Sequence, residues 1–241
     1  MRQLKLSHLS LAALLALVSA TAAQAQQAGD TIVAIGAARI APSLSLGALN
    51  SVGLDAATFN GYTSGASASA GYAETLSFSV LQMFTNNVAV EFSLGVPPTI
   101  NLDVNLSSIS TLLPRAAKAD VLTPTAVAKY LFNTPADKFR PYAGLGLTYA
   151  SFDKVSADKS NVLVNALGGT SASLSSSWAP VYSLGFIYNF TDRLSVNALV
   201  AYIPLKSDVT FVGPGLSGPV TTTGTVDINP TDYVVRIGYK F

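Results

Sequence analysis

The most constraining feature of the sequence is a strict alternation of two sets of side chains near its C-terminus. From residue 232 to 241, every second position carries a large apolar or aromatic residue: Tyr233, Val235, Ile237, Tyr239 and Phe241. The positions between them are mixed and include Asp232, Arg236 and Lys240. Successive side chains of a β-strand point to opposite faces, whereas a helix would not separate these two sets. The segment is therefore predicted to be a strand with one apolar face.

The same alternation recurs along the chain. It is clear from Trp178 to Phe190, where aromatic and apolar residues alternate with smaller ones, and from Phe139 to Phe152. Read in this way, the sequence predicts eight strands, near 31–40, 72–84, 88–96, 121–132, 139–152, 178–190, 194–206 and 231–241.

The predicted strands are joined by short and long connections in turn. Residues 85–87, 133–138 and 191–193 are short and rich in turn-forming residues. The connections near 41–71, 97–120, 153–177 and 207–230 are long and rich in Ser, Gly, Pro, Asn and Thr, so they are expected to be long extracellular loops. Short turns at one end and long loops at the other are typical of bacterial outer-membrane barrels.

Composition favours the membrane over water. Charged residues are 11% of the chain and mean hydropathy is +0.42, whereas soluble domains carry about 25% charged residues. Past residue 25, no apolar run reaches the roughly 18 residues that a spanning helix needs. The predicted fold is therefore all-β: a transmembrane eight-stranded antiparallel up-and-down β-barrel.

Aromatic residues gather at the ends of the apolar faces, as in the girdles of membrane barrels. One group lies beside the short turns and the C-terminus: Phe84, Tyr130, Phe132, Phe139, Tyr188, Phe190, Tyr239 and Phe241. The opposite group is Tyr72, Tyr149, Trp178 and Tyr202. The alternative is a secreted β-sandwich whose aromatics face a core, which leaves the long uncharged strands unexplained.

The first 25 residues have the pattern of a signal peptide. Arg2 and Lys5 precede an apolar stretch from Leu9 to Val18, and Ala23-Gln24-Ala25 is a small-x-small cleavage site. The alternative is an N-terminal anchor helix, for which the apolar stretch is short. We expect residues 26–241 to form the mature barrel.

Residue types missing from the mature chain exclude much chemistry. The sequence has no Cys, and its one His is His8, inside the predicted signal peptide. Disulfides, thiol or His-based catalysis and His- or Cys-ligated metals are therefore excluded. No acid pair lies in a recognisable catalytic motif, so no enzyme, catalytic residue, metal site or cofactor is predicted. Without Arg2 and Lys5 the chain has 12 basic and 13 acidic residues, which gives no support for nucleic-acid binding.

Alternation also assigns the residues that face the lumen. Toward the short turns, the inward set is charged and is interpreted as a polar plug made of Glu91, Lys129, Arg140 and Arg236. Glu91 is expected to pair with one or more of these cations, because charges in a low dielectric need partners. Toward the long loops, the inward set is apolar and is interpreted as a channel lining: Val121, Ala150, Phe152, Val181, Ile203 and Val234. Side chains largely fill an eight-stranded barrel, so an open water-filled pore is not expected.

Lys138 to Gly146 reads Lys-Phe-Arg-Pro-Tyr-Ala-Gly-Leu-Gly. This stretch is similar to Phe-Arg-Pro-Tyr-x-Gly-x-Gly of the OmpW family of outer-membrane barrels, which the sequence resembles, and it is the most specific match. Leu122 to Thr125 resembles the family's Leu-Pro-Pro-Thr, with Thr123 in place of the first proline. Further similarity lies in residues 29–31, 41–42, 84–91, 130–132, 178 and 238–241, so it covers nearly the whole mature chain except the loops.

The resemblance implies an outer-membrane location and the passage of small hydrophobic molecules. The implied partners are outer-membrane lipids, small apolar solutes and the outer-membrane insertion machinery, which would read Tyr239 and Phe241 as an assembly signal. A second hypothesis stays open, in which the barrel is a structural anchor and its loops bind partners or host factors. An apolar upper lumen favours the first hypothesis.

Overall fold

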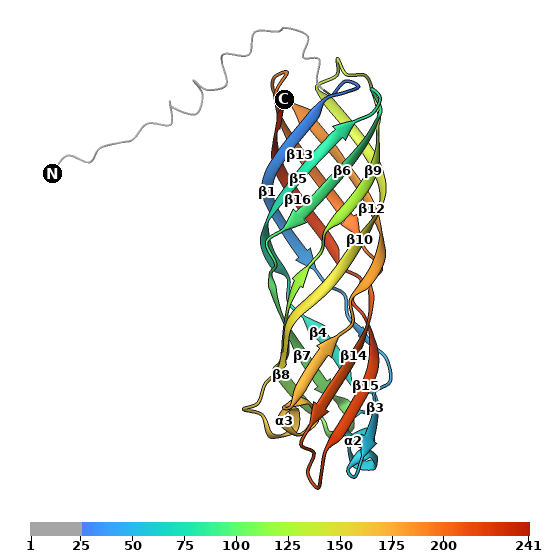
Figure 1. Cartoon of the computed structure of the whole chain (residues 1–241), viewed down its shortest axis with the longest axis vertical. Helices are drawn as coiled ribbons and strands as arrows, with labels where there is room; N and C mark the ends of the chain where they lie inside the picture. The colour runs from blue at the N-terminus through green and yellow to red at the C-terminus, as the bar shows by residue number, and fades with distance from the viewer. Residues whose placement is uncertain (1–25) are drawn as a thin grey trace, which may run out of the picture.

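The computed structural model describes residues 26–241. The predicted signal peptide lies outside the described residues. Eight long strands form the body of the molecule: β1 (Thr31–Ala41), β5 (Ala73–Met83), β6 (Val88–Gly95), β9 (Thr125–Leu131), β10 (Phe139–Ala157), β12 (Ser177–Asn189), β13 (Leu194–Tyr202) and β16 (Thr231–Lys240). Each pairs antiparallel with the next along the chain, β16 pairs with β1, and the predicted closed eight-stranded barrel is confirmed (Figure 1).

The barrel follows the predicted alternation residue by residue. Along β16, Tyr233, Val235 and Ile237 are exposed while Val234 and Arg236 are buried. Because the barrel is closed, it has no free strand edge. Each of the eight strands forms backbone hydrogen bonds with a neighbour on both sides and needs no water to satisfy them. The exposed face is therefore the apolar one and the buried face is the lumen.

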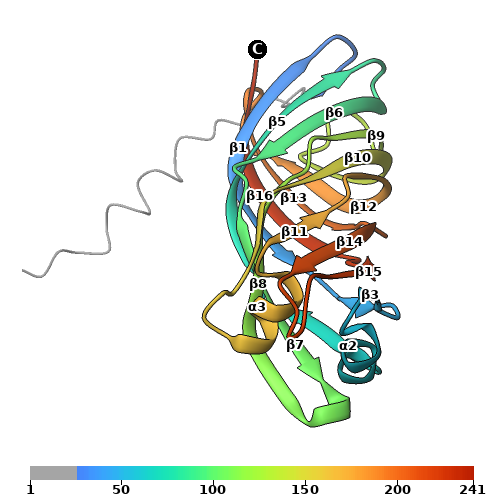
Figure 2. The ribbon, with the colours of Figure 1, turned by 60° about the horizontal axis from the view of Figure 1, so that its bottom comes forward.

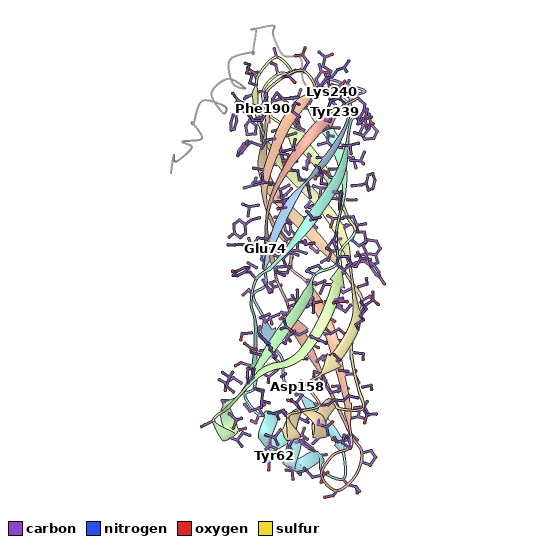
Figure 3. All side chains as sticks on the ribbon, turned by 90° about the vertical axis from the view of Figure 1, so that its left-hand side faces the viewer. Tyr62, Glu74, Asp158, Phe190, Tyr239 and Lys240 are labelled. Atoms are coloured by element: carbon purple, nitrogen blue, oxygen red, sulfur yellow. The ribbon has the colours of Figure 1, made fainter. Side chains whose placement is uncertain are left out.

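The aromatic groups lie where the sequence placed them. Ring pairs Tyr130–Phe132, Tyr188–Phe190 and Tyr239–Phe241 have centroids 5.1–5.3 Å apart at the end with the short turns, called here the turn end. Phe190, Tyr239 and Lys240 mark this end in Figure 3. Tyr149 and Trp178 form a pair nearer the other end, with centroids 5.1 Å apart.

The four long connections are ordered rather than irregular. They contain β2 (Ser45–Leu46), β3 (Asn50–Gly53), β4 (Ser67–Ala70), β7 (Thr99–Leu106), β8 (Thr111–Leu122), β11 (Ser171–Leu174), β14 (Lys206–Gly213) and β15 (Val220–Asp227), with α2 (Ala56–Thr63), α3 (Val162–Gly168) and a 3-10 turn at Ser107–Ile109. We call this assembly the loop tier. Its strands continue the molecule away from the short turns in two groups (Figure 2). The strands β8, β7 and β4 extend the large sheet from β10, and β11, β14, β15 and β2 form a second sheet in which β3 also pairs with β15. These segments were predicted to be loops because they are rich in Ser, Gly, Pro, Asn and Thr as a group.

Prolines explain two strand boundaries that were predicted incorrectly. The predicted strand 121–132 is two strands, because β8 ends at Leu122 and β9 begins at Thr125 across Pro124. The predicted strand 194–206 stops at Tyr202, before Pro204. Proline has no N–H to donate to a ladder, so a strand is interrupted there.

Glycine makes room inside the narrow barrel at one cross-strand pair. Gly185 lies opposite Tyr142, whose ring fills the lumen. A Cβ atom at Gly185 would lie 2.5 Å from the Ala198 carbonyl oxygen and 2.7 Å from the Tyr142 hydroxyl. Neither contact is tolerable without movement of the wall.

We therefore expect Gly185→Val to destabilise the barrel by about 1–3 kcal/mol, the usual cost of overpacking. Denaturant unfolding in detergent, followed by heat-modifiable gel migration, measures this loss. Leu184→Val is the matched control, because Leu184 is 68% exposed on the outer face. Equal stability of the two variants would contradict the steric argument.

A carboxylate holds the far end of the loop tier together. Asp55, at the start of α2, accepts hydrogen bonds from the backbone N–H groups of Leu216 and Ser217, both at 2.6 Å. The bond from Ser217, supported by that from Leu216, lowers the pKa of Asp55 against the opposing effect of burial.

A group with a lowered folded-state pKa stabilises the fold above its ordinary pKa and loses this contribution as the pH falls through the folded value. The β14–β15 tip should therefore loosen in acid, and Asp55→Asn should loosen it at neutral pH. Hydrogen exchange of the peptide around residues 214–219, corrected for intrinsic rates, measures both effects. Asp208→Asn, on an exposed side chain of the same hairpin, should leave that exchange unchanged.

Candidate functional site

The lumen near the turn end holds a buried charge cluster. Glu91 accepts from Lys129 Nζ at 2.9 Å and from Arg236 Nη1 at 3.0 Å. The three side chains are between 1% and 5% exposed. They come from β6, β9 and β16, and alternation turns each of them inward. Two cations therefore share one carboxylate.

Neutral polar groups complete this cluster. Lys129 donates to the Tyr142 hydroxyl at 3.1 Å, and that hydroxyl donates to Asn197 Oδ1 at 2.8 Å. Asn197 Nδ2 in turn donates to Glu91 Oε2 at 3.3 Å, and Arg236 Nε donates to Ser77 Oγ at 3.0 Å. The network reaches across the lumen from β5 to β13, so it forms a floor. A floor of this kind offers no dry path to an apolar molecule.

Arg140 is buried, but it does not join this floor. Its Nη1 donates to the Gln26 carbonyl at 2.8 Å and its Nη2 donates to the Asn86 carbonyl. Of the three cations considered as partners of Glu91, Lys129 and Arg236 pair with it and Arg140 does not. Arg140 is the second residue of β10 and lies too close to the turn end. It closes the barrel there together with Gln26, whose side-chain amide bonds Asn189.

The upper lumen is apolar, and its predicted residues face inward. Ala150, Val181, Ile203 and Val234 are at most 6% exposed, and the first three pack in one cluster with Val127, Ala179, Ala201 and Leu205. Val121 and Phe152 are half-buried and line a cavity in the mouth of the barrel. Strand alternation accounts for the inward position of the predicted lining residues. Their role in the passage of a solute stays a prediction.

Two small apolar cavities follow one another above this lining. The mouth cavity, of about 70 Å³, lies where the barrel meets the loop tier. A second cavity, of about 90 Å³, lies within the loop tier. Both are lined by Leu102, Ala119, Leu174 and Val226, so they adjoin. These four residues lie in segments that were predicted to be loops, so none of them was predicted to line a cavity. The alternation in β15 was the available signal.

The barrel wall is interrupted beside the mouth cavity. The ladder between β6 and β9 ends at the pair Ser93–Thr125, and the ladder between β7 and β8 begins at the pair Thr99–Asp120. Between these two ladders, residues 94–98 and 121–124 form no regular pairs with each other. This interval contains Pro97, Pro98 and Pro124, which lack backbone donors. A hydrogen bond from the Val121 N–H to the Pro98 carbonyl, at 3.1 Å, crosses it.

The interruption has a cavity on its inner side and a hollow on its outer side. Val121 and Thr123 line the mouth cavity, while Leu94 and Pro124 line a hollow on the outside of the barrel. Leu94 is 45% exposed, which places that hollow on the apolar outer face.

The proposed assembly residues lie on the outer face at the turn end. Phe241 is 79% exposed and Tyr239 is 42% exposed. This position fits the expectation from alternation, while their recognition by insertion machinery stays a prediction.

Within residues 26–241, no group of three or more His, Cys, Asp or Glu side chains is arranged to hold a metal ion. In the same range, no helix has the length and apolar character needed to cross a membrane.

Comparison with known proteins places the chain among outer-membrane proteins. Outer membrane protein W of Vibrio cholerae serotype O1 is 28% identical over 233 residues, which cover 95% of this chain and 96% of that protein. Outer membrane protein AlkL of Ectopseudomonas oleovorans is 27% identical over 213 residues, covering 88% and 82%. The crystal structure of OprG from Pseudomonas aeruginosa matches with a TM-score of 0.78 at 27% identity, covering 90% of this chain and 98% of that chain.

The relatives and the barrel agree on location, which is the bacterial outer membrane with its lipids around the apolar face. The OmpW family model matches residues 27–241. The chain is therefore a member of the OmpW family of outer-membrane barrels.

Proposed function

We propose that this barrel lets small apolar solutes cross the outer leaflet and leave sideways into the membrane. The observation that carries the proposal is the change of lining along the lumen, from apolar cavities in the loop tier and mouth to a closed ionic floor below. Burial of apolar surface favours entry from water into such a lining. The route requires the loop tier to face the outside and the turn end to face the periplasm.

The floor supports an exit through the wall rather than through the base. An apolar molecule that moved past Glu91 would have to separate charges that are paired in a low dielectric. The wall at residues 94–98 and 121–124 is a weaker barrier, because its prolines leave few hydrogen bonds to break. The mouth cavity and the outer hollow lie on its two sides.

The cavities are narrow, and this bears on how a solute enters. Each is smaller than the dry cavity of about 150 Å³ that holds one benzene molecule. A solute therefore widens the path by displacing apolar side chains of the loop tier. Selection for low polarity follows, because a polar solute would exchange its water for an apolar lining without compensation.

The second hypothesis, a structural barrel that anchors binding loops, predicts a lumen packed with polar groups up to its mouth. The apolar cluster around Val181 and Ile203 and the cavities above it favour passage instead.

Charges in the upper lumen should abolish passage and leave the barrel folded. Val181→Asp and Ile203→Lys introduce a charge that draws water into the lining but does not meet lipid, because both side chains face inward. Ile203→Leu, which conserves volume, is the control. Uptake by intact cells with and without each gene, for apolar and polar solutes of equal size, measures passage, and heat-resistant migration measures folding. Folded charge variants that pass apolar solutes at the wild-type rate would exclude this route.

The floor should depend most on its single carboxylate. Glu91→Gln leaves Lys129 and Arg236 buried without a counter-ion, which typically costs about 3–5 kcal/mol. Lys129→Met leaves the neutral pair Glu91–Arg236 and should cost clearly less. Denaturant unfolding of the two variants gives the comparison. An equal or larger loss for Lys129→Met would show that Glu91 is not the shared partner.

A further inference from the structure

The mouth cavity contains one ionisable side chain. Its lining is apolar apart from Thr123, Thr148 and Asp232. The hydroxyl of Thr148 is already occupied, since it donates to the Pro124 carbonyl at 3.1 Å and accepts from Thr125 at 2.9 Å. The carboxyl group of Asp232 is therefore the conspicuous polar feature of this cavity.

Asp232 faces the lumen and lacks a partner. It is the second residue of β16, where it pairs with Ile40 of β1 and Ala201 of β13, and it shares its face with Val234 and Arg236. Its Oδ1 atom is buried, and no hydrogen-bond donor reaches that atom within residues 26–241. Buried polar atoms are nearly always hydrogen-bonded, so an orphaned carboxyl oxygen in an apolar cavity requires an explanation.

Neighbouring cations are engaged elsewhere. Arg236 is bound to Glu91 and Ser77 in the floor, below the intervening Val234. Arg39 forms an exposed ion pair with Glu74 on the outer face, with Nη2 to Oε1 at 2.6 Å. Glu74 lies near the middle of the long axis in Figure 3, and it pairs with Arg39. The next residue, Ile40, pairs with Asp232. Asp232 therefore lies at about this level, where the barrel meets the loop tier.

Other orphaned atoms do not offer the same opportunity. Within the described part of the chain, the buried side-chain atoms without a hydrogen-bond partner are Ser79 Oγ, Ser183 Oγ, Arg140 Nε, Asp227 Oδ1 and Asp232 Oδ1. Asp227 Oδ1 is 3.2 Å from Lys206 Nζ, an ion pair on the loop tier. Asp232 alone in this set lines the mouth cavity.

We propose that Asp232 selects the head group of the solute, accepting a hydrogen bond from an apolar chain that ends in a hydroxyl or an ammonium group. This inference rests on the proposed function and narrows its substrate class from apolar solutes to apolar chains with a donor head group. The chain would lie against Phe152, Val121 and Ile203, while the head group would occupy the free acceptor of Asp232.

The chemistry discriminates between molecules of equal size. In its ionised form the Asp232 carboxylate only accepts hydrogen bonds, so it binds an alcohol or an ammonium group in preference to an ether, which has no donor. A carboxylate head group would place like charges together without water and is disfavoured. An alkane makes no polar contact and leaves the oxygen orphaned.

Two isomers provide the sharpest probe. 1-Octanol and 1-methoxyheptane have the same atoms, but the alcohol alone carries a donor. Their gene-dependent uptake rates are compared in intact cells, together with that of octane, for wild type, Asp232→Leu, Asp232→Asn and Asp192→Asn. Asp192 lies in an exposed turn at the turn end and serves as the matched removal of one carboxylate. Heat-resistant migration confirms that each barrel is folded.

We expect wild type to take up the alcohol faster than the ether by on the order of tenfold, the worth of one good hydrogen bond. Asp232→Leu should bring this ratio close to one and leave octane uptake unchanged or higher. Asp232→Asn keeps a carbonyl acceptor and should keep part of the ratio. Asp192→Asn should keep all of it.

A folded Asp232→Leu barrel with the wild-type ratio of alcohol to ether would overturn the inference. Asp232→Ala gives the same comparison if the Leu variant does not assemble. The experiment distinguishes failure of the two proposals. If the wild-type gene adds no uptake of octane or 1-octanol, the proposed function is wrong. If it adds uptake of both, and the ratio of alcohol to ether uptake does not change in the Asp232 variants, only the head-group selection is wrong.

Discussion

Backbone hydrogen bonding in lipid is the constraint on which the rest of this structure depends. A peptide group in hydrocarbon has no water to bond, so a sheet there must close on itself. Closure occurs between β1 and β16, with ten paired positions from Ile32–Lys240 to Ala41–Thr231. Once this register is fixed, strand parity decides the side of every residue in the wall. The apolar outer face, the charged floor and the apolar mouth all follow from it.

In a narrow barrel, strand alternation also decides which side chains contact one another. Eight strands leave space for side chains and little else, so the inward residues contact one another across the lumen. Glu91, Lys129 and Arg236 meet in this way from three strands, and Tyr142 fits because Gly185 stands opposite. The resulting floor is a barrier to apolar molecules. The proposed sideways exit depends on this barrier as much as on the interrupted wall above it.

The loop tier and the mouth cavity add selectivity to the barrel. Ordered strands from all four long connections carry the apolar lining beyond the membrane-facing wall. Asp232 lies where this lining begins, and its unpaired oxygen is the exception in an otherwise dry path. The proposed passage and the proposed choice of head group thus use one cavity, with the wall interruption at its side.

The sequence alone determined the barrel, its eight strands and the side on which each residue of those strands lies. Alternation is a local pattern, so it can be read without knowing which strands pair. It also predicted the polar and apolar halves of the lumen. Tertiary structure decided which charges meet: Glu91 pairs with Lys129 and Arg236, whereas Arg140 caps the turn end with Gln26 and Asn86. It also decided the loop tier, the cavities and the isolation of Asp232. These depend on register and on the stagger between strands, which bring together residues far apart in sequence and leave no local signal.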